Sequence, residues 1–210
     1  QHELSEHYVQ ITQIGGMTNR NFKVTWSNES YVLRIPGNGT EGMIVRENED
    51  YNSRLAYQLK ITPEIFYLDV QSGVKLVRYI EGAETLNNAT IQYMNHIEKV
   101  IMVLRTLHTS GVRFNNDFNV FKEIEIYEEL LGRVKGWMYE GYSELRPSIF
   151  ALADRLNQLG VTLTPCHNDL VAENFVKGLD GKIHLIDWEY SGMNDPLWDL
   201  AALFFESSFS

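Results

Sequence analysis

The sequence contains little cysteine, little proline and little positive charge. Cys166 is the single cysteine among 210 residues, so the chain can form no internal disulfide, and a disulfide-stabilised miniprotein is excluded. The 18 Lys and Arg residues are outnumbered by 28 Asp and Glu residues, which gives a formal net charge of −10. Because an acidic chain repels phosphate backbones and anionic lipids, nucleic-acid binding and membrane-surface binding are disfavoured.

Long hydrophobic runs are absent as well. The longest apolar runs, such as residues 201–205, are far shorter than the roughly 20 residues that cross a bilayer. The first eight residues are polar and do not resemble a signal peptide. With 44% hydrophobic and 22% charged residues, the composition is that of a globular protein. We therefore expect a soluble, cytoplasmic protein that binds no nucleic acid and no membrane and prefers a cationic or metal-bound partner, while its oligomeric state stays open.

The first 80 residues alternate turn signals with short runs of β-branched and aromatic residues, which is typical of a small sheet joined by hairpins. The expected strands are residues 11–14, 22–26, 31–35, 65–70 and 74–80. One helix is expected at residues 43–59, where apolar side chains recur at helical spacing until Pro63 ends the pattern. These elements form the first of two expected lobes.

From residue 91 onward, apolar side chains recur every three or four residues, which indicates helices. The expected helices run from residue 91 to Gly111 and over residues 121–139, 144–159 and 196–203, and two strands at 174–177 and 182–188 flank a turn. The sequence therefore predicts an α+β, bilobal fold. Residues 1–80 form a small lobe with a five-stranded antiparallel sheet and one helix, and residues 81–210 form a larger, mainly helical lobe. The cleft between them is expected near residues 78–88.

Three polar residues in the second lobe have the types and the spacing that phosphoryl transfer needs. Asp169 can accept a proton from a substrate hydroxyl. Asn174, five residues later, offers a neutral oxygen ligand, and Asp187, after an apolar strand, offers a charged one. Neutral and anionic oxygen ligands together suit Mg²⁺, and the set is that of a phosphotransferase. The alternative is that these residues only cap a turn and end a strand.

The first lobe contains groups that could hold phosphates. Gly15 and Gly16 lie between two expected strands, where the lack of side chains lets backbone N–H groups approach phosphate oxygens. Arg34 is the single cation in an otherwise apolar strand, so on the buried side it needs an anionic partner. Glu49 on the following helix is the first candidate, and Glu47 is the second. A fixed pair would present the guanidinium to nucleotide phosphates, unless Arg34 faces solvent from an edge strand.

These motifs resemble those of the choline/ethanolamine kinases, and most of all the bacterial choline kinases of the Lic type. That family lies within the aminoglycoside phosphotransferase and protein-kinase-like superfamily. The resemblance rests on GGMTN at residues 15–19, YVLRIP at 31–36, HNDLVAEN at 167–174 and IDWEYS at 186–191, and it covers nearly the whole chain. Related antibiotic kinases carry glycine where this chain has Asn168 and lysine where it has Arg34, so both departures match the choline/ethanolamine branch.

The resemblance implies a protein-kinase-like fold and an enzyme that uses ATP and Mg²⁺ to phosphorylate the hydroxyl of choline, giving phosphocholine. It implies that Asp169 is the catalytic base and that Asn174 and Asp187 bind the metal. The residues that it implies in ATP binding are Gly15, Gly16, Thr18, Asn19, Arg34, Glu49, Val77 and Tyr79, with the backbone of residues 77–80 contacting adenine. Tyr190 and Glu206 would lie with Asp169 at the choline site, since aromatic faces and negative charge bind a quaternary ammonium. Asp199 matches a family aspartate that ties the catalytic loop in place.

Two alternatives to choline phosphorylation stay open. The same reaction could use ethanolamine, an aminoglycoside, thiamine or another small alcohol as acceptor. The chain could instead be a catalytically inactive nucleotide-binding module with a regulatory role, although all the catalytic positions are filled. Members of the family continue with further helices, so we expect the second lobe to be truncated at its C-terminus.

Overall fold

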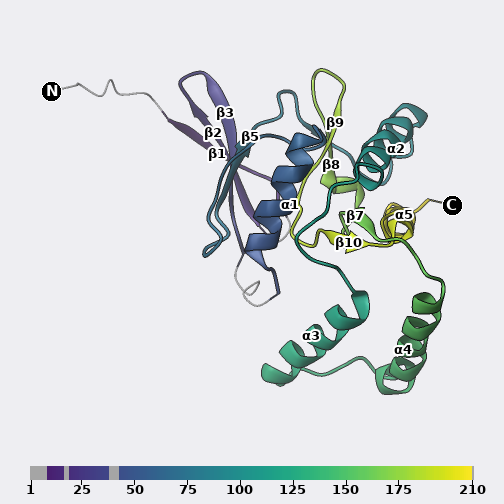
Figure 1. Cartoon of the computed structure of the whole chain (residues 1–210). Helices are drawn as coiled ribbons and strands as arrows, with labels where there is room; N and C mark the ends of the chain where they lie inside the picture. Colours follow the sequence, from purple (N-terminus) through teal and green to yellow (C-terminus); the bar gives the residue numbers. More distant parts are fainter. Residues whose placement is uncertain (1–8, 17–18, 38–42, 210) are drawn as a thin grey trace.

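The computed structural model describes residues 9–16, 19–37 and 43–209. Its N-terminal part is an antiparallel sheet in the order β1-β2-β3-β5-β4, with one helix, α1, beside it (Figure 1). The strands are β1 (Gln10–Ile14), β2 (Arg20–Trp26), β3 (Glu29–Ile35), β4 (Ile65–Leu68) and β5 (Lys75–Arg78), and α1 spans Arg46–Gln58. The predicted small lobe of five antiparallel strands and one helix is confirmed.

The register of this sheet places two cations next to each other. Arg34 of β3 lies opposite Lys75 of β5, and residues that lie opposite each other on neighbouring strands point to the same face. Both side chains reach Glu49 on α1, at 2.7 Å and 3.0 Å. The face of the sheet that carries these cations is therefore the face joined to α1.

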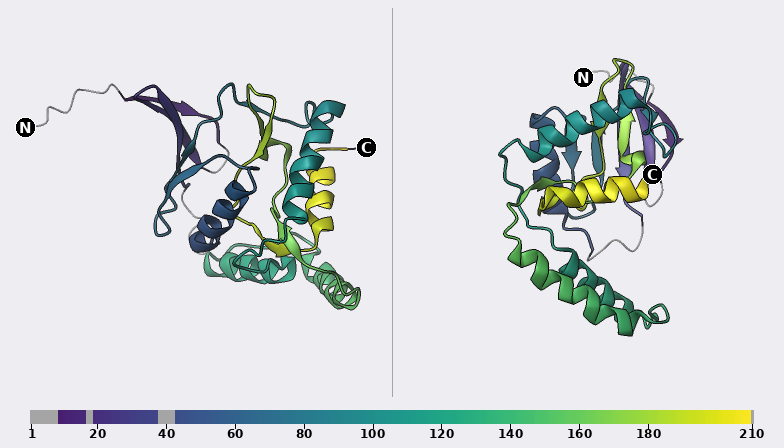
Figure 2. Two further views of the ribbon diagram at one scale, coloured as in Figure 1. Left: turned by 45° about the horizontal axis from the view of Figure 1, so that its top comes forward. Right: turned by 90° about the vertical axis from the view of Figure 1, so that its right-hand side faces the viewer.

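The C-terminal part packs helices against short strands. Helices α2 (Met94–His108) and α5 (Pro196–Glu206) lie side by side (Figure 2). The strands form two small sheets, β6-β8-β9 and β10-β7. Their bounds are β6 (Glu84–Thr85), β7 (Thr164–Cys166), β8 (Phe175–Lys177), β9 (Ile183–Leu185) and β10 (Gly192–Asn194), with a short 3-10 helix η1 at Ala172–Asn174. Buried apolar side chains of α2, of the β8–β9 hairpin and of the segment after it share one core: Val100, Leu104, Leu107, Phe175, Leu185 and Trp188.

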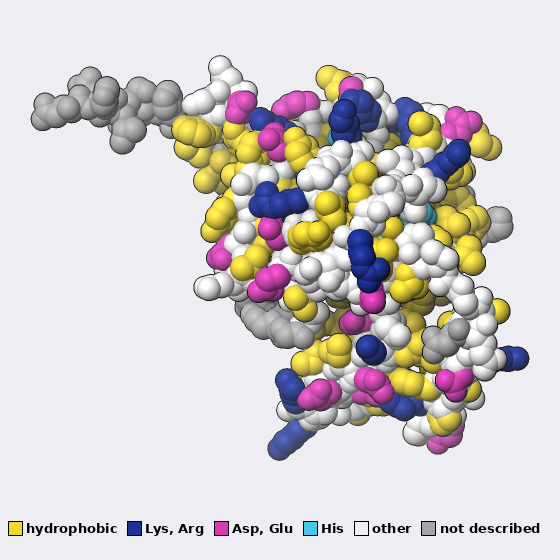
Figure 3. Space-filling view, in the orientation of Figure 1, with side chains coloured by type: hydrophobic (Ala, Val, Ile, Leu, Met, Phe, Trp, Pro, Cys, Tyr) yellow, Lys and Arg dark blue, Asp and Glu magenta, His cyan; other side chains and the backbone are white. Residues whose placement is uncertain are grey.

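Helices α3 (Val120–Arg133) and α4 (Tyr142–Gln158) form an arm that projects from the rest of the molecule (Figure 1). Arg146 of α4 donates to Glu128 of α3 at 2.8 Å, and acidic and basic side chains are mixed over this arm (Figure 3). Over the residues that the structure describes, no helix is both long enough and apolar enough to cross a membrane.

Several boundaries differ from the sequence prediction. The helix expected at residues 121–139 ends at Arg133, because Lys135 has a φ of 53°, which a right-handed helix cannot contain. The strand expected at residues 182–188 stops at Leu185, so Asp187 lies in the segment that follows it. Strands β6, β7 and β10 were not predicted, since two or three residues are too few to show an alternating pattern.

Candidate active site

The β8–β9 hairpin brings the two predicted metal ligands together. Asn174 directly precedes β8 and Asp187 follows β9, and the two strands pair antiparallel. The N–H of Ile186 donates to the carbonyl of Asn174 at 2.9 Å, so both residues stand at the same end of the hairpin. The Asn174 amide nitrogen donates to the carbonyl of Asp169 at 2.8 Å. The predicted base and the predicted ligands therefore meet at one place.

One buried carboxylate holds the loop that carries Asp169. Asp199, on α5, is 0% exposed and accepts the backbone N–H groups of His167 at 3.0 Å and Asn168 at 2.7 Å. The same carboxylate lies 2.8 Å from Nε2 of His108 at the end of α2. Asn168 has a φ of 69°, a conformation that Asn tolerates better than most residues. These contacts are those of a loop anchor, as the family resemblance implies for Asp199.

Asp187 combines an unusual backbone with a crowded charge environment. Its φ is 69°, which is strained for a residue other than glycine. Burial and the neighbouring charge of Glu189 raise the pKa of Asp187 to about 6, although Arg34 acts in the opposite direction. The Arg34 guanidinium lies 3.3 Å from the Asp187 carboxylate, whose side chain is still 32% exposed. This carboxylate is accessible and is only partly balanced by positive charge.

The predicted pair of Arg34 and Glu49 is present. The guanidinium lies 2.7 Å from the carboxylate, and the two residues are 8% and 1% exposed. Glu47, the second candidate partner, is exposed. Glu49 is also bound by Arg46 at 2.7 Å and by Lys75 at 3.0 Å. Burial alone would raise the pKa of Glu49, but the charges of Lys75 and Arg34 outweigh it and lower the pKa to about 2.

Three members of this charge cluster were not found from the sequence: Arg46, Lys75 and Glu189. Glu189 lies 3.2 Å from Arg34 and 2.6 Å from Arg46. Within the described part of the chain, the cluster joins three cations to three carboxylates. A signal existed for Lys75, which interrupts an apolar strand as Arg34 does, and for Arg46, which stands one helical turn before Glu49.

The turn between β1 and β2 shows why a glycine is needed at one position. A Cβ at Gly16 would lie 2.2 Å from the carbonyl oxygen of Asn19, whereas a Cβ at Gly15 would have nothing within 4 Å. Thr18 lies outside the described residues. Asn19 is 7% exposed, its amide lies 3.5 Å from Glu189, and its Oδ1 atom is buried without a hydrogen-bond partner. A buried acceptor of this kind is costly unless a ligand or water supplies a donor.

The segment predicted to contact adenine starts inside the sheet. Val77 belongs to β5 and lies opposite Val32 of β3. The N–H of Tyr79 donates to the carbonyl of Ser30 at 3.0 Å. This N–H is therefore already used in a hydrogen bond within the sheet. Among the described residues, the N–H of Ile80 has no hydrogen-bond partner. Within this segment, the N–H of Ile80 rather than that of Tyr79 is the candidate donor to a ligand.

Tyr190 contacts the loop that carries Asp169. Its carbonyl accepts the Asn168 amide at 3.0 Å, and its hydroxyl lies 3.2 Å from the hydroxyl of Tyr127 on α3. Burial, Tyr127 and the charge of Asp169 all raise the pKa of Tyr190. Glu206 is exposed at the end of α5, and in the region described no hydrogen bond or ion pair joins it to Tyr190. Tyr127 was not predicted, because 63 residues separate the two tyrosines.

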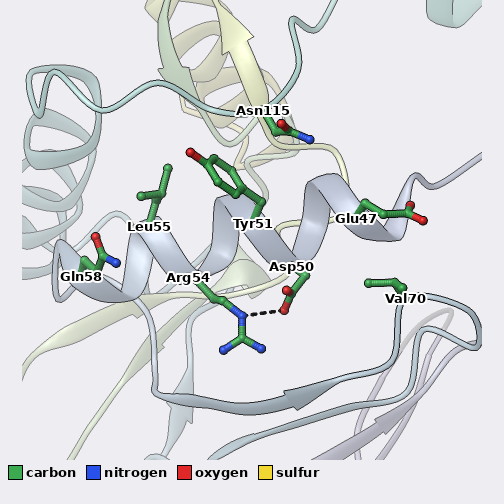
Figure 4. Close-up of a pocket in the computed structure, with 8 residues that line it drawn as sticks. All are labelled: Glu47, Asp50, Tyr51, Arg54, Leu55, Gln58, Val70 and Asn115. Carbon is green, nitrogen blue, oxygen red and sulfur yellow. Dashed lines mark hydrogen bonds and ion pairs between the residues drawn. The ribbon is translucent and has the colours of Figure 1, made fainter.

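Two further features lie outside this cluster. A cavity of about 440 Å³ runs along α1 (Figure 4). Its lining includes Tyr51, Arg54 and Glu47, the second candidate partner of Arg34, but no residue predicted to bind ATP, metal or acceptor. His108, Cys166 and Asp199 bring potential metal-ligand atoms within 4.8 Å of one another. Burial, however, raises the pKa of the Cys166 thiol to about 12, and the Asp199 oxygens already accept two backbone N–H groups. We therefore assign this trio to loop anchoring.

Known proteins resemble the chain over almost its whole length. A family model described as choline/ethanolamine kinase matches residues 10–210. Protein LicA of Haemophilus influenzae is 38% identical over 211 residues, which cover 100% of this chain and 61% of that protein. The crystal structure of choline kinase LicA from Streptococcus pneumoniae has a TM-score of 0.86 and 41% identity, covering 96% of this chain and 70% of that chain. A structure of LicA in complex with AMP also has a TM-score of 0.86 and 41% identity, over 98% of this chain and 71% of that one. The chain thus spans less than two thirds of the Haemophilus protein.

Proposed function

This chain belongs to the choline/ethanolamine kinase family, and we propose that it transfers the γ-phosphate of ATP to the hydroxyl of choline, giving phosphocholine. One observation carries the proposal: Asp169, Asn174 and Asp187 meet at one end of a hairpin, beside the buried pair of Arg34 and Glu49. Phosphoryl transfer needs this combination of a base, oxygen ligands for a metal and a fixed cation for the phosphates. The likeness to choline kinase LicA at 41% identity supports choline as the acceptor.

ATP would lie between the sheet and the β8–β9 hairpin. Glu49 already holds Arg34, so the planar guanidinium can bind phosphate oxygens without first being ordered. Backbone N–H groups of the turn at Gly15 and Gly16 would bind further phosphate oxygens, and the unpaired N–H of Ile80 would contact the base. The structure of LicA in complex with AMP supports nucleotide binding by this chain.

Asn174 and Asp187 would hold Mg²⁺. The Asn174 amide nitrogen is used by the carbonyl of Asp169, so the amide oxygen is its ligand atom, and with the Asp187 carboxylate it forms the hard oxygen set that this ion prefers. When bound, the ion neutralises negative charge on the phosphates. Asp169 would orient the acceptor hydroxyl in line with the γ-phosphate and accept its proton as the new P–O bond forms and the bond to ADP breaks.

Tyr190 and Tyr127 would bind the cationic end of the acceptor. A quaternary ammonium donates no hydrogen bond, so it is held by aromatic faces and by negative charge. The two tyrosine hydroxyls lie 3.2 Å apart, and the charge of Asp169 acts on Tyr190, so this aromatic pair adjoins the proposed base. Glu206, at the exposed end of α5, is the proposed second contact of the ammonium group.

A panel of acceptors tests this function. Purified protein is supplied with Mg·ATP and, in separate reactions, with choline, ethanolamine, thiamine or an aminoglycoside, and kcat/KM is measured for each. We expect phosphocholine to form and choline to have the highest kcat/KM, since a site built from aromatic faces discriminates against a primary ammonium that needs hydrogen-bond acceptors. A higher kcat/KM for another alcohol would show that this alcohol, and not choline, is the preferred acceptor of the same kinase reaction. Stabilisation by ATP without turnover of any acceptor would favour a nucleotide-binding module without catalysis.

A further inference from the structure

Helix α1 is joined to the C-terminal lobe through a side chain that takes no part in the proposed chemistry. Asn52 lies three residues after Glu49 and is 0% exposed. Its amide nitrogen donates to Oδ1 of Asn116 at 3.0 Å, and to the carbonyl and the hydroxyl of Ser191 at 3.0 Å and 3.1 Å. Its amide oxygen accepts the backbone N–H of Asn115 at 2.9 Å. One buried amide thus connects α1 to two separate segments of the other lobe.

These hydrogen bonds fix the amide in one orientation. The backbone N–H of Asn115 must meet an oxygen, so the Asn52 amide cannot be turned round without losing bonds on both sides. The Asn116 amide also donates to the carbonyl of Ser191 at 3.1 Å, and Asn115 lies against α1 beside the cavity (Figure 4). A buried polar network whose members are all satisfied is rigid and selects one arrangement.

The segment that Asn52 contacts also carries site residues. Ser191 follows Asp187 and Glu189 in the same connecting segment, so α1 is tied to that segment twice. One tie is the ion pair of Arg46 with Glu189 at 2.6 Å, and the other is the neutral contact of Asn52 with Ser191. Ion pairs of a cluster with three cations and three carboxylates can exchange partners, whereas hydrogen bonds to a single amide are directional. The hydrogen bonds between Asn52 and Ser191 therefore define the position of α1 more closely than the ion pair does.

We propose that Asn52 is a positioning residue that holds α1 against residues 187–191, so that Glu49 keeps Arg34 in place for the nucleotide. This inference rests on the proposed kinase function. It means that contacts within the chain itself, without a modification or a partner, hold α1 in the position that the site needs. Asn52 acts through Glu49 and touches neither the nucleotide nor the acceptor. Its effect on catalysis must therefore disappear when Glu49 has already lost its charge.

A double-mutant cycle tests this dependence. Asn52→Asp keeps the size and the accepting oxygen but places a second oxygen against the acceptors of Asn116 and Ser191. We expect kcat/KM for ATP to fall at least about tenfold, as for a buried polar group deprived of its partners, while KM for choline changes less than about twofold. In a Glu49→Gln background, the same substitution is expected to change kcat/KM for ATP less than about twofold, because the pair that it positions is already lost.

Asn48→Ala is the matched control. It removes the exposed hydrogen bond from the Asn115 amide to Asn48 at 2.7 Å, one turn earlier on the same helix, and is expected to leave the kinetics within about twofold of the native values. Equal losses from Asn52→Asp in the native and Glu49→Gln backgrounds would show a merely structural role and overturn the proposal. Should Asn52→Asp not fold, Asn116→Ala removes one acceptor from the same network and takes its place in the cycle.

A readout without turnover separates this inference from the proposed function. Hydrogen exchange of the amides of residues 49–56 is measured in the native protein, Asn52→Asp and Asn48→Ala without nucleotide or acceptor. Faster exchange in Asn52→Asp than in Asn48→Ala supports the positioning of α1 by Asn52, and equal exchange refutes it. If the native protein phosphorylates no acceptor, the proposed function fails, and this comparison still decides the role of Asn52.

Discussion

Replacement of Glu49 by glutamine perturbs the buried charge cluster at its centre. Glu49 is 1% exposed, and its carboxylate lies within 3.0 Å of Arg34, Arg46 and Lys75. Glutamine keeps the shape of the side chain but removes the charge that the three cations share. Loss of one partner from a buried ion pair destabilises a protein strongly, because a buried charge is left uncompensated.

The magnitude follows from the pKa of Glu49, which the cations lower from 4.5 to about 2. Such a shift corresponds to about 3 kcal/mol of free energy of unfolding. Because the pKa in the folded state is below the unfolded value, this stabilisation is complete above about pH 4.5 and is lost as the pH falls toward 2. The difference between the native protein and Glu49→Gln must therefore depend on pH in that window.

The assay is urea unfolding at pH 7 and at pH 3. We expect Glu49→Gln to lower the free energy of unfolding by about 3 kcal/mol at pH 7 and by about half of that at pH 3. The control Glu47→Gln removes an exposed acid from the same helical turn and is expected to stay within about 0.5 kcal/mol of the native protein. A Glu49→Gln variant as stable as the native protein at pH 7, or a deficit of equal size at both pH values, would refute this reasoning.

Three further predictions concern other parts of the site. Gly16→Ala should weaken Mg·ATP binding, measured by calorimetry, more than Gly15→Ala does, because only a Cβ at position 16 would lie 2.2 Å from a carbonyl oxygen. Equal effects of the two substitutions would contradict this. Asp199→Asn should lower kcat at least about tenfold with little change in KM for ATP, since an amide cannot accept both loop N–H groups; unchanged steady-state kinetics would argue against loop anchoring. Cys166 is buried and the pKa of its thiol is about 12, so a thiol reagent at pH 8 should label it only after unfolding in urea, and rapid labelling of the folded protein would disagree with the structure.

Sequence reasoning succeeded where a single residue violates its local pattern. Arg34 is a cation in an apolar strand, which predicts a buried acid as its partner unless the side chain faces solvent, and Glu49 is that acid at 2.7 Å. The hairpin and turn signals likewise located the five strands of the sheet, and the matched family confirms the resemblance that the motifs indicated. Asp199 also anchors the loop that carries Asp169, as the resemblance implies.

Sequence reasoning failed where a contact depends on register or on distant segments. Lys75 reaches Glu49 beside Arg34 only because β3 and β5 pair in one particular register, and Tyr127 reaches Tyr190 across 63 residues. Asn52 looks like an ordinary polar residue of an amphipathic helix, yet it is completely buried, because the other lobe satisfies its amide. A local pattern marks Lys75 as a cation in an apolar strand, but no local pattern shows which residues Lys75, Tyr127 and Asn52 contact.

The most direct measurement of the central claim is phosphocholine formation by the native protein and by Asp169→Asn, each supplied with Mg·ATP and choline. Asparagine keeps the size of the side chain but cannot accept the hydroxyl proton as a carboxylate does, and general-base catalysis contributes about 10²- to 10⁴-fold. We predict that the native protein forms phosphocholine and that the variant binds Mg·ATP normally but loses at least about a hundredfold in kcat. A native protein that binds Mg·ATP without forming phosphocholine, or a variant as active as the native protein, would contradict the account.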